Sequence, residues 1–109
     1  MTADWVLAGG LMLACAGPAG AQDVLAGREK AQHCSLCHGE LGLAVAPNAP
    51  NLAGENAAYV AAQLKAFRDG AREHHQMTII ASGLSDGDIA DLAAWFAAIS
   101  VKATAPDLD

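Results

Sequence analysis

The stretch Cys34-Ser35-Leu36-Cys37-His38 places two thiols three positions apart and an imidazole directly after the second thiol. This is the spacing by which haem is attached covalently to a polypeptide. If both sulfurs form thioethers to the vinyl groups of one haem, the short turn between them sets His38 beneath the macrocycle, where Nε2 can ligate iron. The stretch therefore predicts that Cys34 and Cys37 carry haem c and that His38 is an axial iron ligand.

Two other kinds of site use a pair of cysteines at this spacing. A thiol-disulfide exchange protein would carry the pair in a βαβ context, and a zinc site would need a second pair of ligands at finger spacing. We find neither context in the sequence, and neither alternative accounts for the adjoining His38. Covalent haem attachment is the interpretation that uses all three side chains.

Residues 1–21 have most features of a secretory signal peptide. Residues 5–16 are apolar or glycine, and this run is short for a membrane span. Ala19 and Ala21 provide the small residues that signal peptidase requires. No Lys or Arg precedes the run, which departs from the class. We expect residues 1–21 to be removed and residues 22–109 to form one domain in the periplasm.

The composition limits the possible partners and the size of the core. The chain has 12 Asp and Glu against 6 Lys and Arg, so nucleic acid is not an expected partner. Cys15 would be removed with the signal peptide; its alternative role is to carry a lipid anchor. The two remaining cysteines, Cys34 and Cys37, would both be bound to haem, so no cysteine is left for a structural disulfide. We expect no membrane insertion after processing. A mature chain of about 88 residues has a small core, so a buried cofactor would supply much of it.

Helical patterns recur along the sequence, and strand patterns are almost absent. Asp23 is a candidate N-cap for a helix over residues 23–34, within which Gly27 favours a close crossing with another helix. A second helix is expected over Ala57–Asp69, with Gly70 at its end. Its apolar face contains Val60, Leu64 and Phe67.

The last expected helix has the clearest start signal. Ser85 and Asp88 match the spacing of a capping box. Apolar residues then repeat at helical spacing, namely Ile89, Leu92, Ala93, Phe96 and Ile99. The segments 39–54 and 72–83 show no helical period and are expected to be irregular.

A haem iron that only transfers electrons needs a sixth ligand, for which Met sulfur and His nitrogen are the usual candidates. Met77 is the only methionine after residue 21. It lies in the expected irregular segment, from which its side chain can be aimed across a cofactor. Met77 is therefore the predicted distal ligand. His74 and His75 are alternative ligands, and Met77 could instead be a packing residue.

Taken together, these motifs resemble those of class I cytochromes c. The likeness is carried by the haem motif with Gly39, by Pro50-Asn51-Leu52 with Gly54, by Met77 and by residues 92–96. The resemblance is closest to small bacterial periplasmic monohaem cytochromes and to single halves of the dihaem cytochromes. In these proteins the following residues also recur in this order: Tyr59, Gln63, Leu64, Phe67, Gly70, Arg72, Leu84 and Ser85.

The resemblance implies an all-α domain of about four helices around one covalently attached haem. It implies that the carbonyl of Pro50 accepts a hydrogen bond from Nδ1–H of His38, which would orient the ligand. It also sets Gly27 against the C-terminal helix near Trp95. Because the chain has one haem motif, any second haem would come from a partner.

The expected function is that of a periplasmic single-electron carrier that is not itself an enzyme. Its partners would be a redox donor and acceptor, such as a dehydrogenase or a terminal oxidase, met in brief and electrostatically guided encounters. One alternative is the haem subunit of a complex such as a flavin-containing sulfide dehydrogenase. Another is an open-site haem sensor or peroxidase, which would follow if Met77 does not ligate iron.

Overall fold

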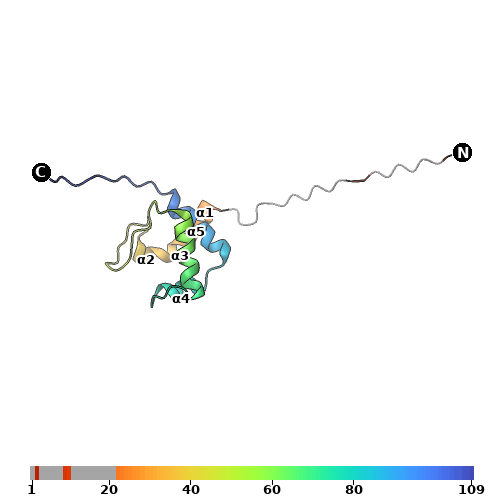
Figure 1. The fold of residues 1–109 in the computed structure, drawn as a ribbon, viewed down its shortest axis with the longest axis horizontal. Coiled ribbons are helices and arrows are strands. Elements are labelled where there is room, and N and C mark those ends of the chain that lie inside the picture. Colours follow the sequence, from red (N-terminus) through yellow and green to blue (C-terminus); the bar gives the residue numbers. More distant parts are fainter. Residues whose placement is uncertain (1, 3–8, 11–21) are drawn as a thin grey trace.

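The computed structural model describes residues 2, 9–10 and 22–109, so the expected signal peptide lies almost entirely outside the described part. The elements in the described part are α1 (Val24–Lys30), the 3-10 helix η1 (Ala31–Cys34), α2 (Ser35–His38), α3 (Ala57–Asp69), α4 (Met77–Ser82) and α5 (Asp86–Ala98) (Figure 1). Since these residues form no strand, the expected all-α class is confirmed. None of the described helices has the length and apolar character needed to cross a membrane.

The first and last helices cross at a glycine. Asp23 caps α1, because its Oδ1 accepts the backbone N–H of Ala26 at 3.1 Å. Gly27 is buried where α1 meets α5. A Cβ atom on Gly27 would overlap the carbonyl oxygen of Asp91 and lie 2.9 Å from Cβ of Trp95. The predicted close crossing is therefore present, and it depends on the missing side chain.

A buried carboxylate fixes the start of α1 onto α5. Asp91 is only 8% exposed, and its Oδ2 accepts a hydrogen bond from Nζ of Lys30 at 2.6 Å. Its Oδ1 accepts the backbone N–H of Asp23 at 3.0 Å. Lys30 also pairs with Asp88 at 2.9 Å. The bond from Lys30, followed by that from Asp23, holds the pKa of Asp91 below its usual range, and the same pairing raises the pKa of Lys30.

We expect this pairing to make the stability of the fold depend on acid pH. Because the folded-state pKa of Asp91 is lowered, its contribution is present above the ordinary carboxyl pKa and is lost as pH falls through the folded value. Lys30→Met removes the partner and keeps the apolar stem. The variant should unfold at lower denaturant concentration at pH 7, with a weaker decline in stability between about pH 5 and pH 2. Denaturant titrations followed by far-UV circular dichroism measure both effects.

Lys102→Met is the matched control, because Lys102 lies in the exposed C-terminal segment. It removes the same charge without touching Asp91. A Lys30→Met protein with the parental midpoint and pH profile would show that the pairing does not stabilise the crossing of α1 and α5.

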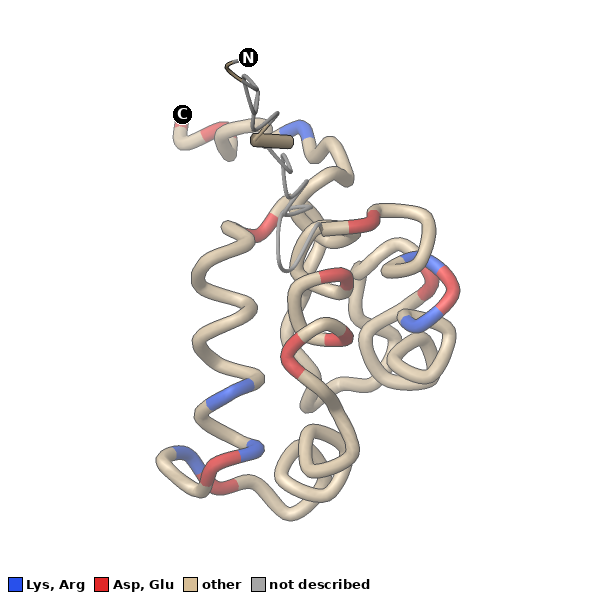
Figure 2. The backbone as a smooth tube through the Cα atoms, turned by 90° about the vertical axis from the view of Figure 1, so that its right-hand side faces the viewer, with Lys and Arg blue, Asp and Glu red and all other residues tan. Residues whose placement is uncertain are grey.

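A second ionic link joins the end of α3 to the start of α5. Nη1 of Arg68 donates to Oδ1 of Asp86 at 2.7 Å. Figure 2 shows that the basic residues are confined to α1, to the C-terminal part of α3 with the loop that follows, and to the C-terminal segment. These residues are Arg28, Lys30, Lys65, Arg68, Arg72 and Lys102. The segments 31–64 and 73–101 contain none.

Helix α3 (Ala57–Asp69) has the predicted bounds and ends at Gly70 as predicted, and the structure adds a cap at its start. Oδ1 of Asn56 accepts the backbone N–H of Tyr59 at 3.0 Å at its start, and Gly70 ends it in the left-handed conformation with φ of 85°. Val60 and Phe67 on the predicted apolar face are buried. Tyr59, at the edge of that face, is 53% exposed.

Helix α5 begins with the predicted capping box. Oγ of Ser85 accepts the backbone N–H of Asp88 at 3.0 Å, and a carboxylate oxygen of Asp88 accepts the backbone N–H of Ser85 at 3.0 Å. The predicted apolar stripe is buried from Ile89 to Phe96. The core centres on Ala31, Leu92 and Phe96, against which the following partly buried residues pack: Cys34, Leu52, Leu64, Leu84, Trp95 and Ile99.

The structure corrects two expected boundaries. Residues 72–83 were expected to be irregular, but Met77–Ser82 form α4. This helix contains β-branched residues of modest helix propensity, and it forms where it packs against α3 and buries Ala81. The single helix expected over residues 23–34 is α1 followed by η1, which tightens the chain immediately before the cysteine motif.

Candidate haem site

The two cysteines of the motif lie at the end of η1 and within α2. Both are free thiols and both are partly buried. Burial raises the pKa of the Cys34 thiol above its ordinary value. A disulfide exchange site requires a lowered thiol pKa, because the thiolate is the attacking species. The environment of Cys34 therefore does not favour the thiol-exchange alternative.

His38 ends α2 as a buried and oriented imidazole. The residue is 7% exposed, and its Nδ1 lies 2.8 Å from the carbonyl oxygen of Pro50. Because a carbonyl can only accept, Nδ1 carries the proton and donates to Pro50, which leaves the lone pair of the neutral ring on Nε2. The hydrogen bond that the resemblance implies is present. Such a bond fixes the orientation of a metal-binding imidazole and strengthens it as a donor.

The loop between α2 and α3 folds back on the motif and so brings Pro50 to His38. The backbone N–H groups of Val45 and Ala46 both donate to the carbonyl oxygen of Cys37, at 3.0 and 3.1 Å. Gly42, with φ of 75°, accepts the N–H groups of Leu52 and Ala53 through its carbonyl oxygen at 2.7 and 3.0 Å. A side chain at Gly42 would strike the backbone of Ala53. This glycine therefore permits the fold of the loop.

Met77 is the first residue of α4 and lies close to His38 in space. Its backbone N–H donates to Nδ1 of His74 at 3.3 Å. Since Nδ1 of His74 accepts hydrogen bonds, its neutral ring carries the proton on Nε2 and has no free lone pair for iron. His75 is exposed. Met77 and His38 are thus the candidate axial pair that the fold brings together.

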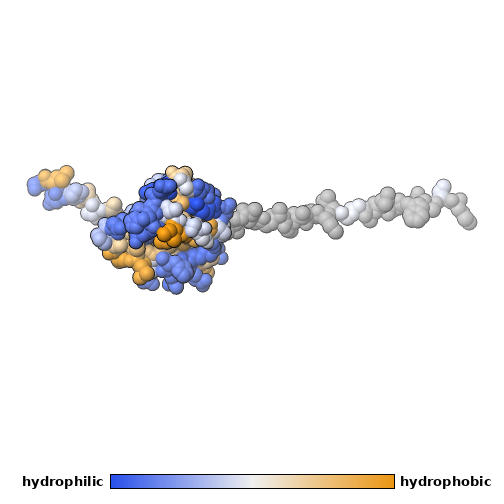
Figure 3. Space-filling view, turned by 90° about the horizontal axis from the view of Figure 1, so that it is seen from below, coloured by the Kyte–Doolittle hydropathy of each residue, from blue (hydrophilic) through white to orange (hydrophobic). Residues whose placement is uncertain are grey.

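Large apolar side chains are exposed on the segments that carry these residues. They are Leu36, Leu41, Leu43, Val45, Ile79 and Ile80, and Leu36 is 86% exposed. Figure 3 shows apolar side chains reaching the surface between hydrophilic ones on the face seen from below. Large apolar side chains exposed on the segments that carry a site are unfavourable in water unless something covers them. An apolar, planar cofactor held by neighbouring thiols and an imidazole would do so.

The described residues fit haem better than they fit a bare metal ion. The residues of the site provide the free thiols of Cys34 and Cys37, the available Nε2 of His38, the thioether of Met77 and an apolar surround. Within the part of the chain that the structure describes, no group of three or more His, Cys, Asp or Glu side chains could hold a metal ion. The zinc alternative therefore finds no support there.

One residue of the site has a position that sequence reasoning missed. The sequence indicates His74 only as an alternative ligand, whereas its ring accepts the backbone N–H groups of Gln76 and Met77. Histidine is not among the preferred helix-capping residues, so no capping signal was visible. The only sequence signal was its distance of three positions from Met77.

An all-α fold that brings together Cys34, Cys37, His38 and Met77 is typical of proteins that bind haem covalently through a pair of cysteines. The profile of the Cytochrome c family matches residues 24–100, and the chain belongs to this family. It therefore binds one covalent haem c with its iron and functions in electron transport. The prediction of a class I c-type cytochrome is confirmed.

Similar proteins include short and long members of the family. The chain is 47% identical over 79 residues to cytochrome c-554(548) of Halomonas halodenitrificans, a match that covers 70% of this chain and 95% of that protein. It is 39% identical over 74 residues to the thiosulfate dehydrogenase electron acceptor of Stutzerimonas stutzeri, covering 65% of this chain and 34% of that protein. The crystal structure of reduced recombinant cytochrome c4 from Pseudomonas stutzeri is similar with a TM-score of 0.68 and 36% identity, over 73% of this chain and 47% of that one.

Proposed function

We propose that this cytochrome is a periplasmic carrier of single electrons, with haem bound to Cys34 and Cys37 and with His38 and Met77 as axial ligands. The observation that carries the proposal is the hydrogen bond from Nδ1 of His38 to Pro50, which leaves the lone pair of Nε2 available for iron, and Met77 lies close to His38. When bound, haem supplies a reversible change of one electron at iron.

The protein's own residues would set the reduction potential of the iron. Pro50 orients His38 and increases its donor strength. The thioether of Met77 favours ferrous iron, and the bonding of His74 to the backbone leaves Met77 as the better-placed distal ligand. His38 is buried, and a buried ligand environment disfavours the extra positive charge of ferric iron. These effects together give a relatively high reduction potential, which suits delivery of electrons towards an oxidase or a similar acceptor.

The surface supports brief contacts with other redox proteins and no catalytic step of the chain's own. The segments that carry the site expose apolar side chains and contain no Lys or Arg. With a formal charge of −6, the chain would be guided at long range towards a cationic partner. The name of the Stutzerimonas relative supports a dehydrogenase as the electron donor. Residues 1–21, acting as a signal peptide, would direct the chain to the periplasm.

Three measurements on the unaltered holoprotein test the proposal. Acid-acetone extraction should leave the colour with the polypeptide, because the haem is covalent. The ferric protein should show the weak near-infrared charge-transfer band of sulfur-ligated haem. The ferrous protein should resist carbon monoxide, because Met77 occupies the sixth position. Extraction of the colour would contradict attachment through Cys34 and Cys37, and rapid binding of carbon monoxide would favour a sensor or peroxidase instead.

A further inference from the structure

The start of α4, and with it Met77, needs support from outside the helix. Residues Met77–Ser82 form only six residues of helix, too few to be stable alone. The backbone N–H groups of the first turn also need partners. Gln76, the residue before the helix, provides no capping hydrogen bond from its side chain.

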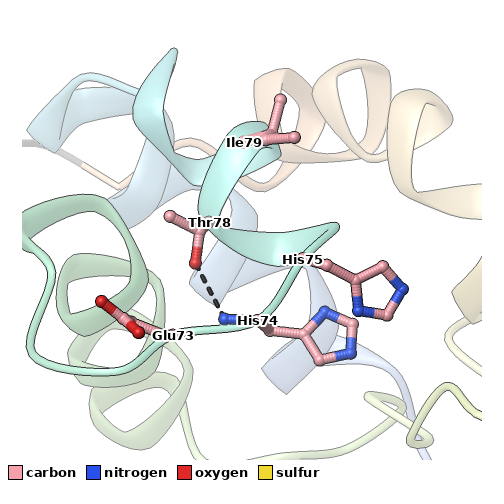
Figure 4. A pocket seen from close by; sticks show the side chains of 5 residues that line it. All are labelled: Glu73, His74, His75, Thr78 and Ile79. Atoms are coloured by element: carbon pink, nitrogen blue, oxygen red, sulfur yellow. Dashed lines mark hydrogen bonds between the residues drawn. The ribbon is translucent and has the colours of Figure 1, made fainter.

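His74 provides the missing partners. Its Nδ1 accepts the backbone N–H groups of Gln76 at 3.2 Å and of Met77 at 3.3 Å. Its own backbone N–H donates to Oγ1 of Thr78 at 2.9 Å (Figure 4), and its carbonyl oxygen accepts the N–H of Thr78 at 3.0 Å. Two of the bonds thus use the ring and two use the backbone, and together they enclose the first turn of α4.

The ring of His74 is itself anchored to α3. It meets the ring of Phe67 edge-on, with centroids 6.5 Å apart and an interplanar angle of 70°. Phe67 is only 7% exposed, and the guanidinium of Arg72 lies 4.5 Å from the centroid of its ring. The ring of His75 lies beside that of His74, at 4.4 Å between centroids. His74 therefore connects the backbone of Met77 to the buried face of α3.

We propose that His74 is a positioning residue for the iron ligand Met77. It acts through the backbone of Met77 and does not bind iron, because its Nδ1 lone pair serves the two N–H groups and its Nε2 carries the proton. The inference rests on the proposed ligation by Met77. Its consequence is that the hydrogen bonds of His74 oppose detachment of the sulfur. Removing them should increase the population in which the sixth position is open.

Titration of the ferric holoprotein with imidazole measures that population. Imidazole binds where the sulfur has left, so its apparent affinity rises in proportion to the fraction that is open. His74→Ala removes a helix cap, and the apparent affinity should increase roughly 5- to 30-fold. His74→Asn keeps an acceptor near the position of Nδ1, and Asn is a favoured cap, so it should restore an affinity close to that of the parent.

Two further variants separate this role from general loosening of the loop. His75→Ala removes the ring beside His74 without removing a bond to Met77, and it should leave the affinity unchanged. Thr78→Val removes the oxygen that accepts the N–H of His74, and it should shift the affinity in the same direction as His74→Ala. If the His74→Ala protein fails to accumulate, Thr78→Val tests the same hydrogen-bonded turn in its place. Far-UV circular dichroism checks that each variant is folded.

The outcomes distinguish this inference from the proposed function. A parental affinity in folded His74→Ala, or an equal increase in His75→Ala, would overturn the role of His74. If the parent itself lacks the charge-transfer band, ligation by Met77 fails and the inference fails with it. If the parent shows the band but neither His74→Ala nor Thr78→Val shifts the titration, only the positioning role is refuted.

Discussion

Met77→Ala is expected to abolish the near-infrared charge-transfer band of the ferric protein while leaving the haem covalently attached. The band arises from sulfur bound to ferric iron, and Met77 supplies the only thioether after residue 21. The reduction potential should fall, because water or a histidine in place of the thioether favours ferric iron. A fall on the order of 0.1 V is expected within the roughly 0.8 V range that axial ligands cover. Optical redox titration measures it.

Met77→Leu is the control that separates ligation from packing. Leucine preserves most of the apolar volume but has no sulfur, so it should lose the band and bind carbon monoxide as the alanine variant does. Its unfolding midpoint should fall less than that of the alanine variant. If either variant keeps the parental band and potential, Met77 is a packing residue and another side chain completes the coordination of iron.

The helices that were predicted well are those whose ends are encoded locally. The box of Ser85 and Asp88 and the left-handed Gly70 are determined by residues a few positions apart, and the structure has both. Helix α4 was missed because its support is not local. It is held by His74 and by packing on α3, and neither leaves a periodic or capping signal in the sequence.

In the candidate site, too, the features that depend on nearby residues could be predicted from spacing, and those that depend on distant residues could not. The pairing of Cys34, Cys37 and His38 is visible from spacing alone, because covalent attachment requires those three residue types in that order. The bond between His38 and Pro50 depends on a loop that folds back through its own backbone, so it could be anticipated only from the family resemblance. The bonds of Asp91 connect opposite ends of the chain and had no local signal.

The protein core explains why cofactor and fold are coupled. Among the described residues only nine hydrophobic ones are buried, several of them alanines, while leucines of the motif and the following loop and isoleucines of α4 remain exposed. A domain of this size rarely reaches adequate stability from so few buried side chains. Covalent haem would cover the exposed group and complete the core, so ligand binding and folding stabilise each other.

Gly27→Ala and Gly87→Ala should change stability in opposite directions, although both replace a helical glycine by a better helix former. At Gly87, in the first turn of α5, the nearest atom to the new methyl group is Oγ of Ser85 at 3.7 Å. This variant should gain up to about 1 kcal/mol from helix propensity. At Gly27 the methyl group would overlap the carbonyl oxygen of Asp91 and crowd Trp95.

The two helices must then separate, which strains the hydrogen bonds that Asp91 makes with Lys30 and Asp23. Overpacking of this kind costs about 1–3 kcal/mol or more, which exceeds the gain in propensity. The melting temperature of the Gly27→Ala holoprotein should therefore fall by several degrees, roughly 4–8 °C for each kcal/mol lost. Thermal melts of both holoproteins provide the measurement. Stabilisation by both substitutions would show that α1 and α5 do not cross as closely as their backbones indicate.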